Sequence, residues 1–351
     1  MMIDSAYKLT EFSKGSGCGC KIAPAVLQKI LHTTSGVVHH PDLLVGNDTN
    51  DDAAVYRLPD KNGLISTVDF FTPIVDDPFD FGRIAAANAI SDVYAMGGKP
   101  ILAIAILGFP VEKLPPELAG RILDGARAVC SKAGIPLAGG HSIDTPEPVF
   151  GLSVNGLVRE QELKRNNTAR PGDLLFLTKP LGVGILAAAA KRGLADASQV
   201  RNVTEVMARL NDCGAELAGI SGVHAMTDVT GFGLLGHLIE VCEGSGVSAE
   251  IDLAKLPMIE GASEFRDRFV FPDNTYRNWN AYEKKVTGVN GPEFITLCDP
   301  QTSGGLLVAA DPSVHHEIKT VLEQFGLHDH VQPVGRCTAK GEFAVSVVSS
   351  R

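Results

Sequence analysis

Short apolar runs separated by Gly, Pro, Asn and Asp alternate with amphipathic segments along the first half of the chain. Runs of β-branched and aromatic residues predict strands, whereas apolar residues three or four positions apart predict helices. Asn62-Gly63 is typical of a two-residue hairpin turn, and Asp77-Pro78 is typical of a helix cap followed by the first helical residue. The predicted strands are 53–58, 64–71, 101–109, 135–138 and 149–158. Three helices are predicted: one that begins near Pro24, one from 78 to about 96, and one over 115–132.

The same alternation resumes after the segment 159–173, which is polar and rich in turn residues and therefore predicts a domain boundary. We expect a mixed α+β and α/β fold of two domains, 23–160 and 170–351, preceded by a Gly- and Cys-rich arm, 1–22. The second half has predicted strands at 174–178, 225–227, 248–253, 306–310, 331–336 and 343–348, helices at 184–192, 203–218, 234–243 and 313–325, and an irregular stretch at 257–292.

Composition excludes several classes of protein. Hydrophobic residues make up 44% of the chain, which is too high a share for a disordered protein, and the formal net charge of −10 argues against nucleic-acid binding. The seven cysteines are odd in number and mostly far apart, as in a reducing compartment. The first residues lack the apolar core of a signal peptide, and the apolar runs are too short to span a bilayer. We therefore expect a cytoplasmic protein that does not bind membranes.

The arm contains the motif GSGCGCK at 15–21, which places Cys18 and Cys20 beside Lys21. A neighbouring ammonium group favours the thiolate, the nucleophilic form of cysteine. Two other interpretations stay open: a flexible terminus with incidental cysteines, and a metal site to which this pair supplies only two ligands. The motif is not a Walker A loop, and it lacks the last glycine of a dinucleotide-binding fingerprint.

Several carboxylates occupy unusual positions. Asp51 and Asp52 belong to the acidic segment GNDTNDDAAV that precedes a strand, and such clustered carboxylates suit Mg²⁺, although an ordinary acidic turn would look the same. Asp92 lies on the predicted apolar face of a helix, and Asp69 interrupts an apolar strand. A charge in such a place is costly unless it is paired or bound to a metal. Backbone hydrogen bonds or a salt bridge are the alternative explanation.

Gly-rich turns are the remaining feature of the sequence that suggests a binding site. Asp228 ends a strand and is followed by the turn VTGFG, whose backbone N–H groups could hold an anion. Residues 139–142 and 302–305 are predicted to be turns of the same kind, although close packing of strand and helix also requires glycine. His141 alone is more typical of a structural histidine. Together, several Asp residues and anion-binding turns without a Walker A loop predict a metal–nucleotide site of another design.

These motifs closely resemble the selenophosphate synthetase family, in the same order and over nearly the whole chain. The matching segments are GSGCGCK at 15–21, DDAAV at 51–55, STVDFF at 66–71, NAISDVYAMGGKP at 88–100, AGGHSID at 138–144, MTDVTGFGLLGH at 226–237 and CDPQTSGG at 298–305. DDAA and the Gly-rich turns indicate only a wider superfamily, which includes aminoimidazole ribonucleotide synthetase, thiamine monophosphate kinase and a hydrogenase maturation factor. The GCGCK arm is what indicates the selenium enzyme.

The resemblance implies that ATP, selenide and water give selenophosphate, AMP and orthophosphate. It implies a homodimer in which the N-terminal domains form a β-barrel. It also implies catalytic roles for Cys18 and Lys21. The metal-binding carboxylates would be Asp52, Asp92 and Asp228, with Mg²⁺ as the cation. The ATP contacts would be Lys21, Thr49, Asn50, Asp51, Asp69 and Asp92, with Gly140, His141 and Ser142 contributed by the partner subunit.

Two other functions remain open at this stage. An ADP-forming small-molecule kinase of the same superfamily would share the carboxylates, and a non-catalytic thiol module could carry selenium through Cys18 and Cys20. The product AMP would exclude the first alternative, and turnover of ATP would exclude the second. Because two phosphoanhydride bonds must be cleaved, we also expect the Gly-rich arm to close over the bound phosphates.

Overall fold

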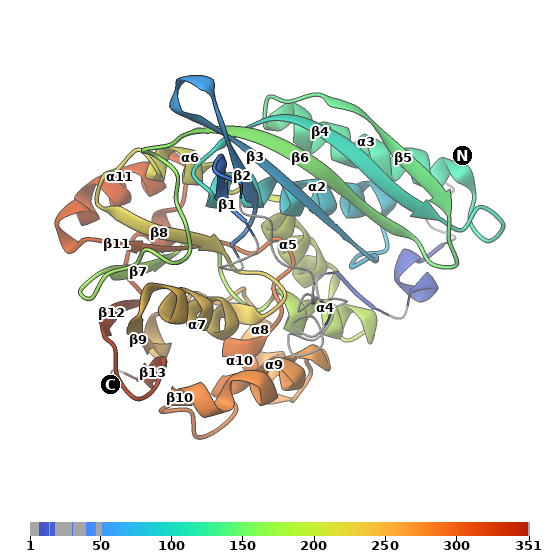
Figure 1. Cartoon of the computed structure of the whole chain (residues 1–351). Helices are drawn as coiled ribbons and strands as arrows, with labels where there is room; N and C mark the ends of the chain where they lie inside the picture. The colour runs from blue at the N-terminus through green and yellow to red at the C-terminus, as the bar shows by residue number, and fades with distance from the viewer. Residues whose placement is uncertain (1–6, 14, 18–29, 31–39, 47–50, 350–351) are drawn as a thin grey trace.

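The computed structural model describes residues 7–13, 15–17, 30, 40–46 and 51–349. Two mixed β-sheets form the framework, and the chain completes the first before it enters the second (Figure 1). The order of strands is β1-β2-β3-β6-β4-β5 in the first sheet and β10-β13-β9-β12-β7-β11-β8 in the second. The helix predicted near Pro24 lies outside the described residues. No helix in the described part of the chain is both long and apolar enough to cross a membrane.

The first sheet is covered on one face by two helices that pack against each other (Figure 1). The N-cap of α2 is Asp77, whose carboxylate accepts a hydrogen bond from the backbone N–H of Asp80, and Pro78 follows it as predicted. The elements of this half are β1 (Leu43–Val45), β2 (Ala54–Leu58), β3 (Asn62–Phe71), α2 (Pro78–Ala95), β4 (Lys99–Phe109), α3 (Pro116–Lys132), β5 (Leu137–Asp144) and β6 (Val149–Arg159), with short 3-10 helices η1 (Leu9–Phe12) and η3 (Pro59–Lys61).

The second sheet lies against helices from the C-terminal half, and its central strands β7 and β11 are almost fully buried. Its elements are β7 (Leu174–Leu177), α4 (Val183–Lys191), α5 (Ala197–Ala208), α6 (Cys213–Leu217), β8 (Val223–Asp228), α7 (Gly233–Ser245), β9 (Val247–Asp252), η4 (Leu253–Lys255), α8 (Ala262–Asp267), α9 (Asn274–Tyr282), η5 (Glu283–Lys285), β10 (Val286–Thr287), α10 (Glu293–Cys298), β11 (Leu306–Ala310), η6 (Pro312–Val314), α11 (His315–Gln324), η7 (His328–His330), β12 (Gly335–Ala339) and β13 (Val345–Val348).

Two predictions in the first half were wrong. The hairpin turn does not lie at Asn62-Gly63, because η3 reverses the chain and Asn62 already pairs with Leu58. Asp60 and Lys61 take the positive φ angles that the reversal needs. The strand predicted at 135–138 instead runs over Leu137–Asp144 and pairs in parallel with β4.

Three predictions in the second half were also wrong. The single helix predicted at 203–218 is two helices, α5 and α6, because Arg209 is extended and the Asn211 side chain bonds to Ser91 and to the carbonyl of Gly304. The stretch expected to be irregular at 257–292 contains α8 and α9. The strand predicted at 331–336 begins only at Gly335, as β12.

Candidate active site

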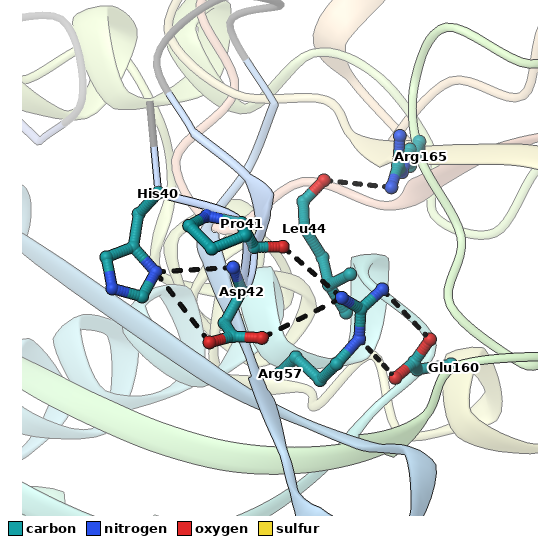
Figure 2. A network of polar contacts seen from close by, with 7 residues as sticks. All are labelled: His40, Pro41, Asp42, Leu44, Arg57, Glu160 and Arg165. Carbon is teal, nitrogen blue, oxygen red and sulfur yellow. Dashed lines mark hydrogen bonds and ion pairs between the residues drawn. The ribbon is translucent and has the colours of Figure 1, made fainter. Parts of the chain in front are cut away.

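The acidic segment is positioned by the strand that precedes it, β1. Arg57 on β2 donates to the carboxylate of Glu160 at 2.8 Å and to the carbonyl of Pro41 at 3.3 Å, while Arg165 donates to the carbonyl of Leu44 at 2.8 Å (Figure 2). These contacts attach β1 both to the neighbouring strand and to the segment that follows β6. The chain therefore enters the acidic segment from a fixed position. Thr49 and Asn50 lie outside the described residues.

Asp51 and Asp52 begin the part of this segment that the structure describes. Asp51 Oδ1 accepts a hydrogen bond of 3.1 Å from the backbone N–H of Asn166, and Asp52 Oδ1 accepts one of 2.8 Å from the hydroxyl of Thr227. The Oδ2 atoms of both side chains are buried and have no hydrogen-bond partner among the described residues. Buried carboxylate oxygens that lack a hydrogen-bond partner are suited to bind a cation.

Electrostatics place four of the predicted carboxylates in one group. Burial raises the pKa of Asp52 well above its usual range, and the neighbouring charges of Asp228, Asp51 and Asp92 raise it further. Burial also raises the pKa of Asp51 to about 6 against the hydrogen bond from Asn166 and the charge of Arg165. Like charges disfavour ionisation unless a cation offsets them. The fold thus brings together carboxylates that are far apart in the sequence.

This group supplies only part of a metal shell. In the described ranges, no three His, Cys, Asp or Glu side chains are arranged so that they could hold a metal ion. Mg²⁺ usually takes only one or two carboxylates and completes its shell with water and substrate phosphates. The carboxylate oxygens of this group, of which Asp51 Oδ2 and Asp52 Oδ2 are buried without a hydrogen-bond partner, therefore fit a Mg²⁺ ion that arrives bound to a polyphosphate.

The anomalous side chains of β3 and α2 face each other. The Thr67 hydroxyl donates to Asp92 at 2.5 Å, and the Asn88 amide donates to Asp69. Asn88 is fully buried. Its carbonyl oxygen accepts a hydrogen bond of 2.8 Å from the backbone N–H of Ser303. The loop 299–305 of the C-terminal half is thereby attached to the helix that carries Asp92.

Sequence reasoning missed the residue that fixes this loop, Lys179. Its ammonium group is fully buried and donates to the carbonyls of Arg209 at 2.7 Å and Ser303 at 2.8 Å. Burial lowers its pKa to about 7, although the nearby charge of Asp228 opposes the shift. The sequence signal that could have identified it is its position at the end of the apolar run LLFLTK, where a charged side chain is unusual.

The Gly- and Cys-rich arm is described only as far as Gly17; Cys18 and Lys21 lie outside the described residues. The backbone N–H of Gly17 donates to the carbonyl of Thr72 at 3.0 Å. A Cβ atom on Gly17, whose φ is +53°, would lie 2.4 Å from the Thr302 hydroxyl. The arm therefore passes between the end of β3 and the loop 299–305, where only glycine fits.

Gly140, His141 and Ser142 were predicted to form a turn, which is wrong. They belong to β5, at the edge of the first sheet, and all three are exposed. A Cβ atom on Gly140 would lie 2.1 Å from the carbonyl oxygen of Ala105. Glycine thus serves close pairing with β4 rather than a change of direction. These three residues are not among the groups that shift the pKa of Asp51 or Asp52.

Asp299 should make stability depend on pH. It is fully buried, its Oδ2 atom accepts from Gly184 at 3.0 Å and from Gln301 at 2.8 Å, and burial raises its pKa to about 8. Between about pH 4, the usual Asp value, and pH 8 the folded state holds a proton that the unfolded state has lost, so stability falls as pH rises. We expect Asp299→Asn to unfold at a temperature at least about 3 °C above the wild type at pH 8. At pH 4 the two proteins should differ much less.

Thermal unfolding in EDTA over this pH range provides the measurement. Asp196→Asn is a matched control, because Asp196 is exposed and its pKa is lowered by hydrogen bonds from Ser198 and Gln199. That substitution should not remove the decline toward pH 8. Parallel pH profiles for the wild type and Asp299→Asn would contradict the prediction.

Comparison with known proteins places the chain in a family. Residues 50–158 match the N-terminal domain of AIR synthase related proteins, and residues 170–348 match the C-terminal domain. Over 338 residues the chain is 53% identical to the selenide, water dikinase of Pasteurella multocida (strain Pm70), which covers 96% of both chains. The chain belongs to the selenide, water dikinase family. The relative from Colwellia psychrerythraea is 51% identical over 98% of this chain and 100% of its own.

Solved structures confirm the fold of the superfamily. The hydrogenase maturation protein HypE in complex with ATP has a TM-score of 0.67 at 19% identity and covers 89% of this chain and 87% of its own. Thiamine-monophosphate kinase from Stenotrophomonas maltophilia K279a has a TM-score of 0.63 at 20% identity, with 93% and 96% covered. Family membership confirms the predicted enzyme activity, ATP-dependent synthesis of selenophosphate.

Proposed function

We propose that the acidic group of Asp51, Asp52, Asp92 and Asp228 is the place where this selenide, water dikinase binds Mg²⁺ and the phosphates of ATP. The observation that carries the proposal is the mutual electrostatic effect of these carboxylates on Asp52 in a buried setting. Bound Mg²⁺ neutralises phosphate charge and polarises the phosphoryl groups. Asp52, Asp92 and Asp228 would supply carboxylate oxygens to Mg²⁺, with one or two of them bound to any one ion and water and ATP phosphates completing its shell.

The remaining predicted residues have roles around this group. Asp51 and Asp69 orient the nucleotide together with Thr49, Asn50 and Lys21. Asp69 is itself oriented by the buried Asn88, which also bonds to Ser303 and so connects Asp69 to the loop 299–305. Cys18 would activate selenide on the arm, and Lys21 would contact the phosphate that is transferred. Products are selenophosphate, AMP and orthophosphate.

The decisive experiment measures the adenine nucleotide formed from ATP with Mg²⁺ and selenide under reducing conditions. Selenide-dependent formation of AMP supports the proposal. ADP as the only product would identify a small-molecule kinase of the same superfamily, and selenium binding without turnover would identify a carrier. Omission of Mg²⁺ should abolish the reaction, and added EDTA should reproduce that loss.

We propose further that the protein is a homodimer that pairs through the first sheet. Thr67 and Asp69 face α2, so Val68 and Phe70 point to the opposite face of β3, where their exposed fractions are 53% and 52%. Ile143 on the edge strand β5 is 58% exposed. An apolar face of this kind beside an exposed edge strand is typical of a protein interface. A second copy would bring Gly140, His141 and Ser142 to the nucleotide of its partner.

The state of association tests this dimer. Phe70→Asp should yield monomers in light scattering at concentrations at which the wild type is dimeric, because a buried carboxylate without a partner opposes association. Leu194→Asp is the matched control: Leu194 is 44% exposed in the loop after α4, and its replacement should leave the dimer intact. A monomeric wild type would overturn the proposed dimer but not the activity.

A reducing cytoplasm is the proposed location. Five described cysteines, Cys130, Cys213, Cys242, Cys298 and Cys337, are buried and form no disulfide. Burial raises the pKa of their thiols, so they are poor nucleophiles and cannot replace the cysteines of the arm.

A further inference from the structure

A cavity of about 610 Å³ borders the loop 299–305, whose Ser303 bonds to Asn88, the partner of Asp69. Its walls come from five separate parts of the chain: the arm, the segment after β3, helix α4, the beginning of α9 and the loop 299–305. Gly15, Ser16, Ile74, Ala188, Asn274 and Thr302 are among the residues that line it. None of them belongs to the acidic group described above. The four carboxylates of the acidic group therefore do not line this cavity.

The cavity is cationic in a chain that is strongly acidic. Lys191, Arg192 and Arg277 line it together with a single acidic residue, Asp273, whereas the whole chain carries a net charge of −10. Lys191 donates to the carbonyl of Ser13 and Arg192 to that of Phe271, which fixes their position without neutralising their charge. Among the described residues, none of the three makes an ion pair. The cavity therefore attracts anions locally.

The position of the cavity connects it to the arm. Gly15 and Ser16 form part of its wall, and Gly17 is held next to them between Thr72 and Thr302. Cys18 follows Gly17 directly in the sequence. Thr302 lines the cavity, and the next residue, Ser303, bonds to Asn88 beside Asp69. One short loop thus separates the cationic cavity from residues of the nucleotide site.

We propose that this cavity is the access route of the anionic selenium substrate, hydrogen selenide, to the arm. The inference rests on the selenophosphate-forming activity and adds the path by which its second substrate arrives. At neutral pH hydrogen selenide is ionised to HSe⁻, an anion that the net negative charge of the chain disfavours and that a local cationic patch attracts. The cavity is much larger than the anion, so it collects and guides the substrate rather than enclosing it.

Charge reversal at Arg277 tests the proposal in the full-length enzyme. Arg277 is exposed on α9, and its guanidinium forms no ion pair with another described residue. We expect Arg277→Glu to lower kcat/KM for selenide about five- to tenfold at low ionic strength through a higher KM, with kcat and the KM for ATP within about twofold of the wild type. The difference should shrink at high salt, because salt screens charges on a solvent-exposed surface.

A matched control separates local from global electrostatics. Lys340→Glu makes the same change of two charge units at an exposed site near the C-terminal strands and should leave the selenide KM unchanged. Equal effects of the two variants, or a selenide KM in Arg277→Glu that equals that of the wild type, would overturn the proposal. Arg277→Gln should show a smaller shift in the same direction. A wild type that forms no AMP would instead overturn the activity, and the access route with it.

Discussion

Cys18→Ser should reduce selenide-dependent formation of AMP by at least about 100-fold. Groups that act directly on the reacting atoms typically contribute about 10²–10⁴-fold, and a hydroxyl group is a far weaker nucleophile than a thiolate. Mg²⁺-dependent binding of ATP should stay within about twofold of the wild type, because the acidic group belongs to other elements. Quantifying AMP and, separately, nucleotide affinity resolves the two effects.

Cys20→Ser is the matched control for this prediction. It makes the same chemical change two residues away on the same arm, and it should retain most of the activity. Full activity of Cys18→Ser would remove Cys18 from its assigned role and leave the nucleotide site standing. Loss of ATP affinity in Cys18→Ser would show that the cysteine acts by organising the site rather than on selenide.

Local sequence signals predicted those elements whose ends are set by local chemistry. The cap at Asp77 and the proline after it define the start of α2, and Gly97 follows its end in a conformation with positive φ. Elements defined by distant contacts were missed. The break between α5 and α6 depends on the bonds of Asn211 to Ser91 and Gly304, which lie about a hundred residues away in either direction.

The residues of the candidate site likewise include some that could be recognised in the sequence and some that could not. Asp92 and Asp69 could be recognised because a charge within an apolar segment is anomalous in the sequence itself. Asp52 was recognised as part of a cluster of carboxylates and Asp228 as the residue before a Gly-rich turn, and the family resemblance implied their binding to metal. Lys179 and Asn88 hold the loop 299–305 through backbone atoms, and no side-chain pattern in the sequence specifies which carbonyl a buried lysine will meet. The cationic cavity was missed for a related reason: Lys191 and Arg192 lie at the end of α4 and Arg277 lies on α9, and each alone is an ordinary surface residue.

Asp52→Asn should abolish activity while making the metal-free protein more stable. The charge of Asp52 is opposed by burial and by the carboxylates of Asp228, Asp51 and Asp92, so its pKa is raised and its ionised form destabilises the fold at neutral pH. Asparagine keeps an oxygen to accept the hydrogen bond from Thr227 and removes the repulsion. We expect an unfolding temperature about 3 °C or more above the wild type in EDTA at pH 7.5. Activity should fall at least about 100-fold, since a ligand of the cation is lost.

The response to Mg²⁺ with ATP distinguishes this effect from simple stabilisation. Wild-type protein should gain stability when Mg²⁺ and ATP are added together, as a ligand that binds only the folded state must produce. Asp52→Asn should lose most of that gain. Asp299→Asn, which also removes a buried carboxylate but lies outside the acidic group, should keep it. A stabilised Asp52→Asn protein that retains both the Mg²⁺ response and the activity would contradict the assignment of Asp52 to the cation, because repulsion relieved without functional loss means that the carboxylates do not need a metal between them.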